Sequence, residues 1–163
     1  TGSGSVAIAL SRHLPPSTLV ATDISFPALE VASFNAENHA RQRIHFIQGD
    51  LLAPLVGPFD LIVANLPYVA DDEWTMVDDG VKWYEPSVAL SGGSDGLDLL
   101  RELLNQASFK LRPGGAILLE IGWQQGETVR QITGQKFPHA EIDVVTDLAG
   151  QDRIVQVLTK QPA

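Results

Sequence analysis

The sequence predicts an α/β fold in which a mostly parallel sheet is covered by helices on both faces. Residues 18–21, 44–47 and 59–64 form nearly continuous apolar runs, which are typical of buried parallel strands. Segments with helical spacing of apolar residues alternate with these runs, and that alternation characterises the α/β class. Ligands of such sheets bind beyond the carboxyl ends of the strands, so we examine the polar residues found there.

Local signals support each element in turn. Ser25 suits the N-cap of a helix and Pro27 suits its first turn. Pro113-Gly114-Gly115 predicts a turn into the strand that follows. Residues 69–95 have no regular period, and we expect a long insertion that acts at the site. The predicted elements are a helix over 5–13, a strand over 18–21, a helix after Ser25, strands over 44–47 and 59–64, a helix over 97–108, a strand over 116–121, a helix over 127–136, and closing strands over 142–146 and 154–159.

Composition indicates one soluble globular domain over residues 1–163, with 44% apolar and 19% charged residues. There are no cysteines, and the four histidines lack metal-ligand spacing, so neither disulfides nor a metal site is expected. No apolar run is long enough to cross a membrane and no secretory signal is present, so we expect a cytoplasmic protein, as a monomer. The net charge of −9 argues against nucleic acid as the main partner.

Two polar signals lie within the first 23 residues, one before the first predicted helix and one at the end of the first predicted strand. The glycines of Thr1-Gly2-Ser3-Gly4 precede a helix, whose free N–H groups and nearby flexible backbone suit close approach of a ligand. Asp23 ends the next strand about 20 residues later, the spacing at which a carboxylate accepts the hydroxyls of a ribose. The alternatives are a tight strand-to-helix turn for the glycines and a helix-capping role for Asp23.

A third signal lies after the strand over 44–47, in Gly49-Asp50-Leu51. Asp50 could accept a hydrogen bond from the amino group of an adenine, and Leu51 could pack on its ring. A simple turn aspartate is the alternative. Because three polar signals follow successive strand ends, together they favour a nucleotide-like ligand over three unrelated turns.

The fourth signal, Asn65-Leu66-Pro67-Tyr68, is the most specific. An amide nitrogen is a poor nucleophile, and its methylation requires two acceptors that hold both N–H groups and aim the nitrogen. The side-chain oxygen of Asn65 supplies one, and the carbonyl of Leu66 can supply the other because Pro67 favours an extended Leu66. Tyr68 can pack on the flat group of the substrate; an Asn-Pro type turn with a buried tyrosine is the alternative. No general base is evident, although Glu85 could assist.

At these residues the chain resembles the HemK-type family of N5-glutamine methyltransferases, which modify peptide-chain release factors. The resemblance covers essentially the whole chain. The run from Glu120 to Gly126 is its most family-specific part. The matching motifs are Thr1-Gly2-Ser3-Gly4, Asp23, Asn35-Ala36, Gly49-Asp50, Asn65-Leu66-Pro67-Tyr68, Tyr84-Glu85-Pro86 with Ala89-Leu90, Pro113-Gly114-Gly115, Glu120-Ile121-Gly122-Trp123-Gln124-Gln125-Gly126 and Asp147 to Val155.

This resemblance implies a Rossmann-like, class I S-adenosylmethionine-dependent methyltransferase fold with a closing antiparallel hairpin. It implies S-adenosylmethionine as methyl donor, S-adenosylhomocysteine as product and a release-factor glutamine as acceptor. By position, Thr1, Gly2, Ser3, Gly4, Asp23, Leu51 and Asn65 would contact the cofactor. Asn65, Leu66, Pro67 and Tyr68 would hold the glutamine and carry the catalysis.

Two features depart from the family. Leu66 stands where the commoner motif has proline, which is tolerable if that residue contributes only its carbonyl. The chain also begins in mid-motif at Thr1, so we expect a fragment that lacks the first central strand and the helical domain that docks the release factor.

Other functions stay open. Adenine-N6 DNA methyltransferases use a similar tetrapeptide, because the adenine amino group poses the same chemical problem, but the charge of −9 weighs against them. A ribosomal-protein glutamine methyltransferase is barely distinguishable by sequence. An inactive cofactor-binding interaction module and a nicotinamide dehydrogenase explain the tetrapeptide less well.

Overall fold

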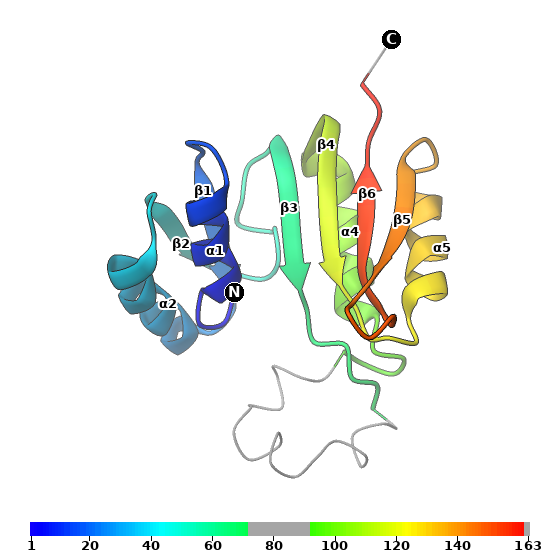
Figure 1. Ribbon diagram of the computed structural model, residues 1–163, viewed down its shortest axis with the longest axis horizontal. Coiled ribbons are helices and arrows are strands. Elements are labelled where there is room, and N and C mark those ends of the chain that lie inside the picture. Colours follow the sequence, from blue (N-terminus) through cyan, green and yellow to red (C-terminus); the bar gives the residue numbers. More distant parts are fainter. Residues whose placement is uncertain (72–91, 162–163) are drawn as a thin grey trace. The chain divides into compact units, whose positions relative to one another are not determined.

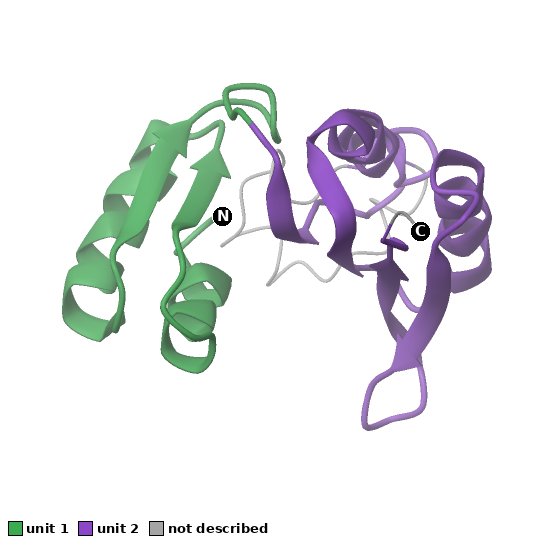
Figure 2. Ribbon diagram, turned by 90° about the horizontal axis from the view of Figure 1, so that it is seen from above, with its two compact units in different colours: residues 1–56 green, residues 57–163 purple. Residues whose placement is uncertain are grey.

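The computed structural model describes residues 1–71 and 92–161 (Figure 1). The chain divides into two compact units, residues 1–56 and residues 57–163 (Figure 2). Each unit has its own small sheet and its own helices. The predicted insertion over 69–95, with Glu85 and the motifs at 84–86 and 89–90, lies mostly outside the described residues.

The first unit is a β–α–β arrangement preceded by a helix. Two parallel strands pair in continuous register, from Leu19 opposite Ile44 to Asp23 opposite Gln48. The two helices contact each other and both strands. The elements are α1 (Ser5–His13), β1 (Leu19–Asp23), α2 (Phe26–His39) and β2 (Ile44–Gln48).

Local capping explains where both helices begin. The residue before α1 is Gly4, whose φ of 80° is a left-handed conformation that favours glycine. The residue before α2 is Ser25, whose hydroxyl accepts a hydrogen bond from the N–H of Ala28 at 3.4 Å. Pro27 lies in the first turn of α2, so the predicted N-cap and helix start are confirmed.

The second unit contains a four-stranded mixed sheet in the order β3-β4-β6-β5. β3 and β4 are parallel, whereas β6 runs antiparallel to both of its neighbours. The predicted closing hairpin is therefore confirmed as β5 and β6. The elements are β3 (Phe59–Asn65), α4 (Asp98–Lys110), β4 (Leu111–Glu120), α5 (Gly126–Lys136), β5 (Glu141–Thr146) and β6 (Asp152–Leu158).

One face of this sheet forms the core of the second unit. Alternate side chains along β4 and β6 are fully buried, which is the period of two that a strand imposes. Helices α4 and α5 contact each other and lie on the same side of the sheet (Figures 1 and 2). The buried residues of this core are Ile117, Leu119, Val155 and Val157 from the sheet and Leu100, Leu103, Leu104, Ala107 and Val129 from the helices.

The structure corrects the predicted start of the fourth strand. We expected a turn at Pro113-Gly114-Gly115 and a strand from 116, but β4 begins at Leu111. Leu111 pairs with Phe59 and the next paired residue is Ala116, opposite Leu61, so the residues between form a bulge within the strand. The predicted turn is present, since Gly114 has a φ of 75°, but it lies inside β4 because pairing with β3 resumes at Ala116.

Helix α4 also extends two residues further than the predicted 97–108, to Lys110. Within the described parts of the chain, no helix combines the length and apolar character that crossing a membrane requires.

Candidate functional site

The glycine loop lies at the carboxyl end of β1 within the first unit. Gly2 and Gly4 have positive φ values of 56° and 80°. The N–H of Gly4 bonds to the carbonyl of Thr1 at 3.0 Å, which closes a turn directly before α1. The side chain of Asn35, on α2, donates to the carbonyl of Ser3 at 3.0 Å and holds the loop from the other side. The loop is therefore a fixed turn at a helix N-terminus, as the glycine pattern predicted.

Asp23, the last residue of β1, holds this loop through its carboxylate. Its Oδ2 accepts hydrogen bonds from the N–H of Gly2 and from the backbone nitrogen of Thr1, both at 2.8 Å. Its Oδ1 accepts a bond from the N–H of Ser25 at 2.9 Å. Burial raises the pKa of Asp23, but these hydrogen bonds outweigh burial and hold its pKa below the ordinary value. Asp23 is thus ionised at neutral pH, and a carboxylate with about four acceptor positions keeps capacity for a further donor.

Asp50 and Leu51 reach the same end of the first unit. The carbonyl of Asp23 accepts a bond from the N–H of Gly49 at 2.9 Å, and the hydroxyl of Thr22 donates to the carbonyl of Leu51 at 2.7 Å. Leu51 has a φ of 48°, a strained conformation for a residue with a side chain. Asp50 is exposed. The structure therefore gathers the three predicted cofactor segments of this unit, Thr1 to Gly4, Asp23 and Asp50-Leu51, at its carboxyl edge.

Gly4→Ala is expected to destabilise the first unit more than Gly2→Ala. Alanine is strained at both positions, by about 1 to 3 kcal/mol, because φ is positive at each. A Cβ at Gly4 would also meet the Cβ of Ala32 at 3.0 Å, whereas a Cβ at Gly2 meets nothing within 4 Å. Urea unfolding followed by circular dichroism measures the difference, and equal losses for the two variants would contradict a tight contact between the loop and α2.

Asn65 is the last residue of β3, where it lies opposite Glu120 of β4. The side chain of Asn65 is exposed, and no hydrogen bond to it occurs among the described residues. Its amide oxygen is therefore available to a ligand at the carboxyl edge of the second sheet. Because paired residues of parallel strands present their side chains on one face, the carboxylate of Glu120 lies on the same face as the amide.

The backbone after Asn65 is held by contacts from two other segments. The carbonyl of Tyr68 accepts a hydrogen bond from the side chain of Gln125 at 3.1 Å. The carbonyl of Val69 accepts one from the N–H of Gly92 at 2.9 Å. Leu66 and Pro67 lie between the strand and these fixed points and are half-buried. The tetrapeptide is therefore anchored at both ends.

Sequence reasoning missed the residues that hold the two loops. Asn35 and Gln125 belong to motifs that resemble the family, but those motifs by themselves indicate no role for either residue. Each is a side-chain amide that bonds a backbone carbonyl distant in sequence, at separations of 32 and 57 residues. A side-chain amide in a turn-like motif indicates that a hydrogen bond is made there. Only the folded structure shows which backbone carbonyl accepts that bond.

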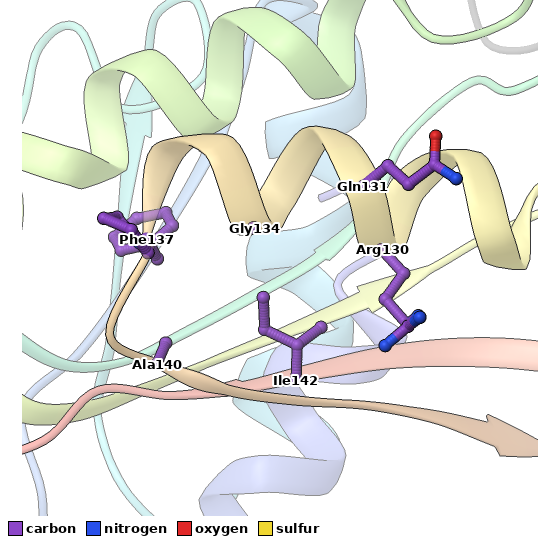
Figure 3. Close-up of a pocket in the computed structure, with 7 residues that line it drawn as sticks. Arg130, Gln131, Gly134, Phe137, Ala140 and Ile142 are labelled. Atoms are coloured by element: carbon purple, nitrogen blue, oxygen red, sulfur yellow. The ribbon is translucent and has the colours of Figure 1, made fainter.

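A surface hollow of the second unit lies away from these residues. It has a volume of about 340 Å³ and is lined by residues of α5 and β5, including Arg130, Phe137 and Ile142 (Figure 3). Phe137 and Ile142 lie toward the amino ends of the parallel strands, opposite the edge that carries Asn65, because β5 begins beside the end of β6 that pairs with Ala116. Within residues 1–71 and 92–161, no group of His, Asp and Glu side chains is arranged to hold a metal ion.

Comparison with known proteins identifies the protein family to which this fold belongs. The family described as the methyltransferase small domain matches residues 1–82, half of the chain, and the chain belongs to that family.

The more particular likeness is to release factor glutamine methyltransferases. The protein of that name from Gloeobacter violaceus is 41% identical over 157 residues, covering 95% of this chain and 55% of the relative. The protein of that name from Bacillus subtilis is 35% identical over 161 residues, covering 97% and 56%. The chain thus spans about half the length of the curated relatives it matches, and the family resemblance seen in the motifs is confirmed.

Solved structures confirm the methyltransferase fold. A ribosomal protein L11 methylase from Lactobacillus delbrueckii subsp. bulgaricus aligns with a TM-score of 0.66 at 24% identity, over 99% of this chain and 67% of that one. The E. cuniculi Mtq2–Trm112 complex, described as responsible for methylation of the eRF1 translation termination factor, aligns with a TM-score of 0.66 at 18% identity, over 99% and 81%. At these identities the likeness concerns the α/β fold.

Proposed function

We propose that this chain is the catalytic part of an enzyme that transfers a methyl group from S-adenosylmethionine to the side-chain nitrogen N5 of a glutamine in a protein, a peptide-chain release factor. The observation that carries the proposal is the tetrapeptide of Asn65 to Tyr68, which begins at a strand end and is anchored by Gln125. The names of the curated relatives support the same substrate.

The residues of the first unit fit a nucleoside cofactor. An ionised Asp23 with a free acceptor position suits a ribose hydroxyl, and the exposed Asp50 suits the amino group of adenine. Thr1, Gly2, Ser3 and Gly4 bring backbone close to such a ligand, and Leu51 offers an apolar side chain. S-adenosylmethionine would supply an electrophilic methyl group.

The residues of the second unit suit an amide acceptor. The oxygen of Asn65 accepts one N–H of the glutamine amide, and the carbonyl of Leu66 accepts the other. With both N–H groups held, the nitrogen is aimed and the positive charge that develops on it is stabilised by two oxygen dipoles. Tyr68 packs on the planar amide. We propose a cytoplasmic monomer that acts on protein without contacting nucleic acid.

Incubating the full chain with isotopically labelled S-adenosylmethionine tests the assignment. Separate reactions contain a release factor, a ribosomal protein fraction and an adenine-containing DNA duplex. We expect label in the release factor, mapped to glutamine by mass spectrometry. Label in the duplex would identify an adenine methyltransferase, label in a ribosomal protein a different glutamine substrate, and label in none of them an inactive cofactor-binding module.

A further inference from the structure

The side chain of Gln125 joins two segments that meet at the acceptor site. Its Nε2 donates to the carbonyl of Tyr68 at 3.1 Å, and its Oε1 accepts from the N–H of Gly122 at 2.9 Å. Both ends of one amide are therefore occupied, and both partners are backbone groups. Such an amide has little freedom to turn, because rotation by half a turn would place each end against a group of the wrong polarity.

The backbone of Gln125 is equally restrained. Its N–H bonds to the carbonyl of Gly122 at 2.9 Å, and its own carbonyl accepts the first hydrogen bond of α5, from the N–H of Val129 at 2.9 Å. Gln125 is thus fixed between the end of β4 and the start of α5. The position of the Gln125 side chain, which donates to Tyr68, is therefore set by β4 and α5 and not by a free loop.

A second contact confines the same carbonyl. A Cβ added at Gly96 would clash with the carbonyl oxygen of Tyr68 and would lie 2.8 Å from Nε2 of Gln125. Gly96 has a φ of 74°, so glycine is required there by conformation as well as by space. The Tyr68 carbonyl is therefore packed between Gln125 and Gly96.

From this geometry we propose that Gln125 is a positioning residue, which holds the carbonyl of Tyr68 and thereby sets the direction of the Leu66 carbonyl. This inference rests on the proposed function. Peptide groups are planar and the ring of Pro67 fixes its φ, so few soft torsions separate the two carbonyls. When the Tyr68 carbonyl is released, the Leu66 carbonyl loses its alignment with the second N–H of the acceptor amide.

Two substitutions of Gln125 test this role in the full chain. Gln125→Met keeps the length of the side chain but loses both hydrogen bonds. Gln125→Glu keeps an acceptor for Gly122 and sets an oxygen against the Tyr68 carbonyl. We expect either variant to lower kcat for protein methylation by about 10- to 100-fold, the effect of misplacing a reacting group, with an unchanged dissociation constant for S-adenosylmethionine. A merely structural role would instead lower thermal stability and cofactor affinity while sparing kcat of the folded fraction.

The neighbouring Gln124 provides the matched control. It is exposed and of the same residue type, so Gln124→Met and Gln124→Glu are expected to retain wild-type kcat. Equal losses in kcat at the two positions would overturn the proposal, because the effect would then not depend on the bond to Tyr68.

A measurement that needs no activity separates this inference from the proposed function. This chain has two tyrosines, Tyr68 and Tyr84, so fluorotyrosine labelling and ¹⁹F NMR report on Tyr68 once Tyr68→Phe has assigned its resonance. We expect Gln125→Met or Gln125→Glu to shift or broaden that resonance, while the Gln124 variants leave it in place. An unchanged Tyr68 resonance overturns the proposal whatever the activity. If the Gln125 variants shift the resonance but the wild-type chain methylates no glutamine, the proposed function is refuted. The positioning of the Tyr68 carbonyl by Gln125 is then still supported.

Discussion

Asn65→Ala is expected to lower kcat for methyl transfer by at least about 100-fold, the loss that follows removal of one preorganised polar group from a transition state. The residue ends β3 with its side chain exposed and without a hydrogen-bonding partner among the described residues, so its oxygen is available to the proposed substrate. Under the proposed mechanism, removing that oxygen leaves one N–H of the acceptor amide without a hydrogen bond, and the nitrogen is no longer oriented toward the methyl group.

The affinity for S-adenosylmethionine is expected to change much less. Titration calorimetry of the variant with S-adenosylmethionine separates the two effects, and Asn65→Asp, which keeps an oxygen acceptor, should retain more activity than the alanine variant. Asn38→Ala is a suitable control, because that exposed side chain bonds within α2, to the carbonyl of Phe34 at 2.8 Å, and to no other group in the described part of the chain. Turnover of Asn65→Ala at the wild-type rate would remove Asn65 from the mechanism.

Leu119→Ala is expected to cost about 2 to 5 kcal/mol of unfolding free energy, as large-to-small changes in tightly packed cores do. Leu119 is 1% exposed, on the face of the sheet that α4 and α5 cover. Truncation there removes apolar contacts and leaves a cavity that the strand, paired on both sides by β3 and β6, cannot collapse to fill.

The preceding residue supplies the comparison. Leu118 is the same residue type on the same strand, but it points to the opposite face and is only half-buried. Leu118→Ala is therefore expected to shift the urea midpoint less than Leu119→Ala. Equal shifts would show that the face covered by α4 and α5 contributes no more to the stability of the second unit than the opposite face does.

Local features of this fold were predictable from the sequence because they depend on neighbouring residues. The cap by Ser25, the start of α2 at Phe26 and the ends of β1 and β3 follow from hydrogen bonds and apolar patterns within a few positions. The start of β4 was not predictable in this way, because it depends on pairing with β3 across a bulge at Gly114.

The sequence also predicts a chemistry for the candidate site. The residue types of Asn65-Leu66-Pro67-Tyr68 match what methylation of an amide requires, and Asp23 and Asp50 follow strand ends where parallel sheets bind ligands. Those expectations concern which groups a site must contain. The sequence pattern does not predict which residues hold these groups in place, because a motif contains its own residues and not the distant residues that bond to them.

The sequence alone determined the fold class, the helix starts and the candidate chemistry of the tetrapeptide in this protein, since each rests on residue types and short spacings. Only the tertiary structure decided that β6 lies between β4 and β5, that Asp23 holds the glycine loop and that Gln125 holds Tyr68. The physical reason is that a hydrogen bond between residues 57 positions apart depends on how strands and helices pack, which no local pattern records.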